Sequence, residues 1–195
     1  MKEILLKGKQ VTLREMTKSD AHDLYEVAQD ERIWAHMMNR METQKDMESY
    51  INAALNAKEQ GSEYPFVIIH NETNKIIGST RFMDINLAHQ RLEIGNTWLN
   101  PKFWRTPVNT ECKYLLFKHC FEELHLNRVQ LKTDHENIRS QQAIKRIGAK
   151  KEGILRNHII RVNGTIRHTV MFSVIKEEWP EVKKSIELIL EEAHK

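Results

Sequence analysis

Apolar positions along the chain recur with two different periods, which separates strands from helices. The stretch "QVTLREM" alternates apolar and polar residues and predicts a first strand. Residues 44–59 instead carry apolar side chains at helical spacing, which predicts a helix ending at Gly61. A shorter helix before it is expected to begin at Ser19 or Asp20, because either side chain can cap a helix.

Strand patterns dominate the middle of the chain. The stretches "PFVIIH" and "KIIGSTRFM" are separated by "NETN", which is typical of a β-hairpin. "RLEIGNTWL" follows as a third strand of this block. Its Gly95 indicates either a bulge or a close approach of another backbone.

Helices and strands alternate in the last part of the chain. The stretch after Pro107 is apolar around most of its circumference, which predicts a helix buried against a sheet. "RVQLKTD" reads as a strand and "NIRSQQAIKRIG" as a short helix. Two strands, around 154–162 and 166–175, flank the turn signal Asn163-Gly164, and an amphipathic helix comes last. This order predicts a mixed α/β domain with a central sheet.

Composition and charge limit the class of protein. The 195 residues suffice for one substantial core, so we expect a single domain over 1–195. The formal net charge of +3, from 30 basic and 27 acidic side chains, gives no basic patch and argues against nucleic-acid binding. No apolar run reaches the roughly 18 residues that a membrane span needs, so we expect no membrane partner and a cytoplasmic protein.

The chain has two cysteines, Cys112 and Cys120, in the same predicted helix. Eight residues of helix would separate them by roughly 12 Å, which is too far for a disulfide. Neither belongs to a CxxC pair, so metal binding is not expected. Buried core thiols are the better interpretation, and a cysteine nucleophile is not expected because no base is evident nearby.

Two segments carry candidate chemistry. In "FWRTPVNTECKYLLF" a loop with Arg105 runs into a helix start, where free N–H groups suit a phosphate, although Thr106-Pro107 is also an ordinary helix start. In the short helix, Asn137 and Ser140 share a stripe with apolar residues and should point inward. A plainer account is that Asn137 caps the helix and Ser140 bonds to the backbone.

With "RLEIGNTWLNPKFWRTPVNTECKYLLF", "TDHENIRSQQAIKRIGAKKEGILR" and "FSVIKEEW" in this order, the chain resembles the GCN5-related N-acetyltransferase (GNAT) superfamily, and within it the branch of ribosomal-protein alanine and serine N-acetyltransferases. The resemblance implies a mostly antiparallel sheet with helices on both faces. It also implies acetyl-CoA as cosubstrate, bound in a V-shaped opening between the fourth and fifth strands, and no metal.

The resemblance also implies which residues meet the cofactor. Its pantetheine arm would pair with a bulged strand, its pyrophosphate would meet the following loop, and an asparagine would hold the arm. The matching positions are Thr97, Trp98, Leu99, Arg105, Thr106, Val108, Asn109, Thr110 and Asn137. Val108 and Thr110 stand where the superfamily has glycine and glycine or alanine, so the phosphate site should depend more on side chains.

The implied reaction is direct attack of a neutral amine on the thioester, without an acyl-enzyme. Ser140 would protonate the leaving thiolate or orient a water that does, and an N–H near Thr97 or Trp98 would stabilise the oxyanion. Glu93 is the candidate base, acting through water, with a strand-face salt bridge as its alternative role. His135, His158 and His168 are weaker candidates for the base, because a lone histidine is more often a surface or packing residue.

The amine acceptor is poorly marked in the sequence. Trp34, Met37, Met38 and Met41 between the first two helices would line an adaptable apolar pocket or belong to the core. A peptide N-terminus and a small amine both remain open, as does a homodimer. A catalytically silent acyl-CoA sensor and an interaction protein built on this fold are the competing functions.

Overall fold

One eight-stranded sheet runs through the computed structural model, which describes residues 3–161 and 163–193. The spatial order of its strands is β1-β2-β3-β4-β5-β6-β8-β7, and only the β5–β6 pair is parallel. The predicted, mostly antiparallel sheet is thereby confirmed. The strands are Leu5–Lys7 (β1), Val11–Glu15 (β2), Tyr64–His70 (β3), Lys75–Asn86 (β4), Arg91–Leu99 (β5), Arg128–Asp134 (β6), Lys150–Ile160 (β7) and Ile166–Ile175 (β8).

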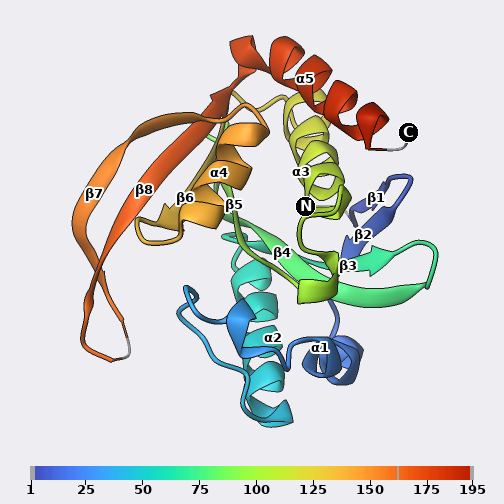
Figure 1. Cartoon of the computed structure of the whole chain (residues 1–195), viewed down its shortest axis with the longest axis vertical. Coiled ribbons are helices and arrows are strands. Elements are labelled where there is room, and N and C mark those ends of the chain that lie inside the picture. The colour runs from blue at the N-terminus through green and yellow to red at the C-terminus, as the bar shows by residue number, and fades with distance from the viewer. Residues whose placement is uncertain (1–2, 162, 194–195) are drawn as a thin grey trace.

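Helices cover both faces of this sheet (Figure 1). They are Ala21–Val27 (α1), Gln44–Glu59 (α2), Val108–Lys118 (α3), Ile138–Arg146 (α4) and Trp179–Glu192 (α5). Leu24 and Met47 place α1 and α2 in one buried apolar cluster. Leu116, Ile144 and Ile186 place α3, α4 and α5 in the other. The sheet therefore separates two cores. No helix within the described ranges is both long and apolar enough to cross a membrane.

The structure matches the predicted order of elements, with one strand added. Residues 44–59 form α2 with the predicted bounds, and Gly61 behind it has a φ of 75°. The short β1 was not predicted, because three residues are too few to show a period. The strand expected around 154–162 begins earlier, at Lys150, and the expected Val162 lies outside the described residues.

The apolar helix after Pro107 is buried as predicted. It continues past Lys118 as a π-helical turn over His119–Glu123, so that Cys120 also faces the core. Cys112 and Cys120 are both free thiols with no exposed surface. Burial raises the pKa of Cys112 to about 11 and that of Cys120 well above its ordinary value. The interpretation as inert core thiols is confirmed.

Glu111 in the first turn of α3 anchors this helix to the β1–β2 turn. Its buried carboxylate accepts backbone N–H bonds from Lys9, Gln10 and Val11 at 2.8, 2.8 and 2.9 Å. A Cβ on Gly8 would lie 2.6 Å from that carboxylate, so only glycine fits there without movement. The start of α3 is thus fixed by residues about one hundred positions earlier.

Candidate active site

The parallel strands β5 and β6 pair over only three positions and then separate. The pairs are Arg91 with Arg128, Leu92 with Val129 and Glu93 with Gln130. Both strands continue beyond this point, β5 to Leu99 and β6 to Asp134. The sheet therefore contains an opening flanked by two unpaired strand edges. Because the strands are parallel, the helices that follow them, α3 and α4, both begin at the open end.

A bulge distorts β5 beside the opening. The β4–β5 register shifts between Ser79 and Arg81, and Asn96 takes a φ of 50°. The irregularity expected at Gly95 is therefore present, one residue later. Trp98 and Leu99 are only 4% and 5% exposed, so their side chains belong to the two cores. Only the backbone N–H and C=O groups of these two residues are therefore available to a ligand.

The loop before α3 is held by its own threonine. The Thr106 hydroxyl donates to the Phe103 carbonyl at 2.8 Å and accepts the Val108 N–H at 3.4 Å. Thr106 thus serves as a helix-start residue, as its sequence context with Pro107 indicated. Because its hydroxyl already makes these two hydrogen bonds, it has little remaining capacity to bind a ligand.

The next two amides of α3 precede its hydrogen-bond ladder. The first bond of the ladder runs from the Glu111 N–H to the Pro107 carbonyl at 2.9 Å. The N–H groups of Asn109 and Thr110 have no acceptor among the described residues. Together with the partial positive charge of a helix N-terminus, they form a place for an anion.

Three arginines gather around Trp104 at this end of the opening. The Arg139 guanidinium, from the first turn of α4, lies 3.7 Å from the Trp104 ring centroid, and Arg32 lies 5.6 Å away. Burial lowers the pKa of Arg139, and the positive charges of Arg105 and Arg32 lower it further. Neither Arg139 nor Arg105 has a carboxylate partner within residues 3–161 and 163–193. Like charges without counter-ions favour an anionic ligand.

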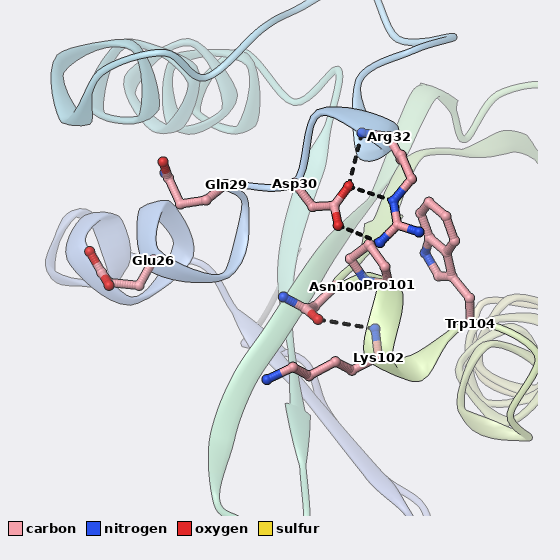
Figure 2. Close-up of a pocket in the computed structure, with 8 residues that line it drawn as sticks. All are labelled: Glu26, Gln29, Asp30, Arg32, Asn100, Pro101, Lys102 and Trp104. Atoms are coloured by element: carbon pink, nitrogen blue, oxygen red, sulfur yellow. Dashed lines mark hydrogen bonds and ion pairs between the residues drawn. The ribbon is translucent and has the colours of Figure 1, made fainter.

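Figure 2 shows how Arg32 is oriented beside Trp104. The Asp30 carboxylate accepts the Arg32 backbone N–H at 3.0 Å and two guanidinium bonds at 2.8 and 2.6 Å. Asp30, Arg32 and Trp104 line a hollow of about 440 Å³, together with Asn100, Pro101 and Lys102. Sequence reasoning found Arg105 but gave no role to its neighbour Trp104. It missed Arg32 and Arg139 because they come from two other segments and match no motif.

At the start of α4, Asn137 acts as the N-cap. Its Oδ1 accepts the Ser140 backbone N–H at 3.0 Å. The capping role considered for Asn137 is therefore present, whereas its Nδ2 has no acceptor in the described part of the chain. The half-buried Ser140 hydroxyl also lacks a hydrogen-bond partner there. Both groups are free for a ligand.

Glu93 lies at the last paired position before the opening. Its side chain is 8% exposed, and Oε2 accepts bonds from Gln130 Nε2 at 3.1 Å and Lys132 Nζ at 2.6 Å. The strand-face salt bridge considered for Glu93 thus exists. Oε1 has no such partner within the described ranges, and it is the atom that a Cβ on Gly95 would approach to 2.9 Å. One carboxylate oxygen is available.

The three alternative histidines have partners on the β7–β8 side of the sheet. The His135 and His168 rings meet edge to face at 4.6 Å, and His168 Nδ1 accepts the Asn157 N–H at 2.9 Å. His158 Nδ1 lies 3.0 Å from the Thr169 hydroxyl. Among residues 3–161 and 163–193, no group of three or more His, Cys, Asp or Glu is arranged to hold a metal ion.

A second hollow, of about 410 Å³, lies between the segment after α1 and the helix α2. Trp34 and Met41 are buried in the core next to it, and Met38 is exposed. Arg81 on its floor bonds Glu63 at 2.9 Å and lies 4.2 Å from the Tyr50 ring centroid. The lining residues are Met38, Asn39, Arg40, Met41, Asp46, Ser49, Tyr50, Ala53 and Arg81.

A family model described as "Acetyltransferase (GNAT) domain" matches residues 10–150. The chain belongs to the GNAT acetyltransferase family. The predicted superfamily is therefore confirmed, and the protein is an acyltransferase of the N-acetyltransferase type. The opening was expected between the fourth and fifth strands. Because the unpredicted strand β1 comes first in this GNAT protein, those two strands are numbered β5 and β6.

Similar proteins and solved structures agree with this assignment. The uncharacterized N-acetyltransferase p20 of Bacillus licheniformis is 30% identical over 173 residues, which cover 87% of this chain and 94% of that protein. A GCN5-related N-acetyltransferase from Brucella melitensis superposes with a TM-score of 0.90 at 25% identity, covering 97% of this chain and 86% of that one. RimJ of Mycobacterium smegmatis, solved in complex with CoA-disulfide, shares the fold with a TM-score of 0.80 at 19% identity, covering 96% and 93%.

Proposed function

We propose that this protein transfers the acetyl group of acetyl-CoA to a primary amine, either a peptide N-terminus or a small amine. The observation that carries the proposal is the separation of β5 and β6 after Glu93 and Gln130. Two unpaired strand edges there offer backbone donors and acceptors to an amide-containing arm, and two helix starts lie at the open end. The pantetheine arm of CoA has two amides and is joined to the phosphates of the nucleotide part, which suits both features.

The anionic end of the cofactor would lie at the start of α3. The free Asn109 and Thr110 amides and the charges of Arg105 and Arg139 would bind its phosphates. No glycine is needed in this arrangement, since the arginine side chains supply contacts that a closer backbone approach would otherwise make. The CoA group in RimJ belongs to that protein and supports the class of ligand.

The proposed chemistry needs two proton transfers and no covalent enzyme intermediate. The amine nitrogen attacks the thioester carbon, the carbonyl electrons move to oxygen, and the C–S bond breaks as the amide forms. Glu93 Oε1 would accept the amine proton through water. The Ser140 hydroxyl would hydrogen-bond the leaving thiolate or protonate it. The raised thiol pKa of Cys112 is consistent with direct transfer.

The acceptor would approach from the face of the sheet that carries α1 and α2. Glu93 and the methionine-lined hollow beside Tyr50 lie on this face, whereas α3 and α4 occupy the other. Met38 is exposed and flexible in shape, which suits acceptors of more than one size.

Thiol release from acetyl-CoA, measured against a panel of amines and peptides alongside a calorimetric titration of acetyl-CoA, tests the proposal. We expect saturable binding and turnover with at least one class of acceptor. Failure of acetyl-CoA to bind would reject it.

A catalytically silent acyl-CoA sensor is the second candidate. It is favoured by the loop without glycine and by the Lys132 ion pair, which engages one oxygen of the candidate base. Binding of acetyl-CoA without turnover of any acceptor would support the sensor over the enzyme.

A further inference from the structure

Lys113 is a buried lysine with a hydroxyl as its partner. Its side chain is 5% exposed, and Nζ donates to Thr97 Oγ1 at 2.6 Å. Thr97 Oγ1 in turn lies 2.7 Å from Thr80 Oγ1. Among residues 3–161 and 163–193, Lys113 has no carboxylate partner. The lysines that do are Lys58, Lys132, Lys150 and Lys183.

Such a residue is costly for stability. An ammonium group removed from water without a counter-ion is unfavourable, and one hydroxyl compensates for little of that cost. Burial accordingly lowers the pKa of Lys113 to about 8, so the charged form still predominates at pH 7. An apolar side chain would fill the same space at lower cost. Packing alone therefore does not explain a lysine here.

Lys113 lies on the side of α3 that faces β5, next to the opening between β5 and β6. Lys113 follows Glu111 by two residues, or about 200° around α3, so the two side chains leave the helix in nearly opposite directions. Glu111 binds the β1–β2 turn, and Lys113 reaches β5. Its partner Thr97 comes directly after Asn96, the bulge residue, on the part of β5 that has no β6 partner.

We propose that Lys113 is a positioning residue for acetyl transfer, holding the bulged segment of β5 through Thr97 and stabilising negative charge on the thioester oxygen there. The inference rests on the proposed function. During attack, the carbonyl electrons move to oxygen, and they return as the C–S bond breaks. Lys113 neither gains nor loses a proton in these steps. A buried cation beside the bulge acts strongly because little solvent screens it.

Lys113→Met and Thr97→Val test the role, with Lys118→Met as the matched control on the exposed side of the same helix. We expect Lys113→Met to keep or raise the melting temperature, because it removes an uncompensated buried charge. Its kcat should fall about 10- to 100-fold, while KM for acetyl-CoA changes less than about 3-fold. Thr97→Val should lower kcat in the same direction, and Lys118→Met should match the wild type.

A pH profile adds a readout that a structural role would not affect. With an acceptor whose amine is neutral throughout, wild-type kcat should decrease as pH rises through about 8, because Lys113 loses its charge. Lys113→Met should lack this decrease. Unchanged kcat in Lys113→Met, or activity lost only in proportion to lost stability, overturns the role of Lys113 alone. Absence of turnover in the wild type with every amine overturns the proposed function as well.

Discussion

At the first turn of α4, the backbone N–H and the side-chain hydroxyl of Ser140 have different roles. The Ser140 N–H donates the cap bond to Asn137 Oδ1, while the Ser140 hydroxyl has no partner in the described chain. Replacing this serine therefore removes a hydroxyl without removing the cap. A catalytic role and a capping role can be distinguished by one substitution.

We expect Ser140→Ala to lower kcat by about 100-fold or more and to leave acetyl-CoA affinity within about 3-fold, because the hydroxyl acts on the leaving thiolate. The melting temperature should stay within about 2 °C of the wild type. Thiol-release kinetics and thermal unfolding measure both, with Ser185→Ala at an exposed position of α5 as the control. A parallel loss of activity and stability would instead support a structural serine.

Around Trp104 the arginines should act on the phosphates of the cofactor. Arg105→Ala and Arg139→Ala should each weaken CoA binding by about 3- to 30-fold, because each removes a charge from an anion site. Pantetheine, which lacks the phosphates, should bind all variants equally. Calorimetry with both ligands measures this, and Arg146→Ala in the last turn of α4 is the control. Equal losses for both ligands would contradict a phosphate contact.

Sequence reasoning reached single residues where their spacing or the family resemblance marked them. Asn137 and Ser140 were found because their spacing places them on one helical stripe. Lys113 and Arg139 were not found, since a lysine or arginine in a helix is usually solvated. Only the fold shows that one is buried against Thr97 and the other stacks on Trp104.

Among the elements, α3 depends on an anchor distant in sequence. Glu111→Gln should destabilise the protein by roughly 2–3 kcal/mol, because the β1–β2 turn loses charge-assisted bonds to a carboxylate. Gly8→Ala should be similarly harmful, since its Cβ would collide with that carboxylate. Denaturant unfolding measures both effects, and Glu72→Gln in an exposed turn should be neutral. Wild-type stability in Glu111→Gln would refute the anchor.

The end of β6 is joined to the β7–β8 hairpin by Asp134. Burial raises the pKa of this carboxyl, but bonds from Arg161 and the Glu136 N–H and the charges of Arg161 and Arg167 outweigh it, so the net pKa is lowered. A lowered pKa gives stability that is present above the pKa of the unfolded chain and is lost as pH falls through the folded value.

Asp134→Asn should therefore lower the melting temperature at pH 7 and flatten its decrease as pH falls below about 5, where the carboxyl of the unfolded chain and then that of the folded protein take up protons. Thermal unfolding across this range measures the effect. An identical pH dependence in the variant and the wild type would show that other carboxylates control acid unfolding.

Element order was largely predictable because α2 has a clear helical period, β6 alternates apolar and polar residues, and α3 is a long apolar stretch. Two local features were not predicted. β1 is too short to show a period. The start of β7 is polar on both sides, because this strand lies at an exposed edge of the sheet. The β5–β6 opening itself was expected only from the family resemblance. Strand pairing depends on partners distant in sequence, which no local pattern contains.

Across the whole molecule, two groups of strands meet along one short seam. β1–β5 form one part of the sheet and β6–β8 the other, and three residue pairs between β5 and β6 join them. The packing of α3 against α5 adds contact behind the seam. The single domain over 1–195, the cytoplasmic location and a homodimer stay predictions.

This short seam has a consequence for the lifetime of the protein. With the acetyl-CoA arm bound as proposed, the ligand supplies hydrogen bonds that the sheet itself omits, and it binds the folded state alone. A ligand at one hundred times its dissociation constant then stabilises the fold by about 2.7 kcal/mol. Since cellular proteases act on opened chains, the abundance of the protein would rise and fall with the supply of acetyl-CoA.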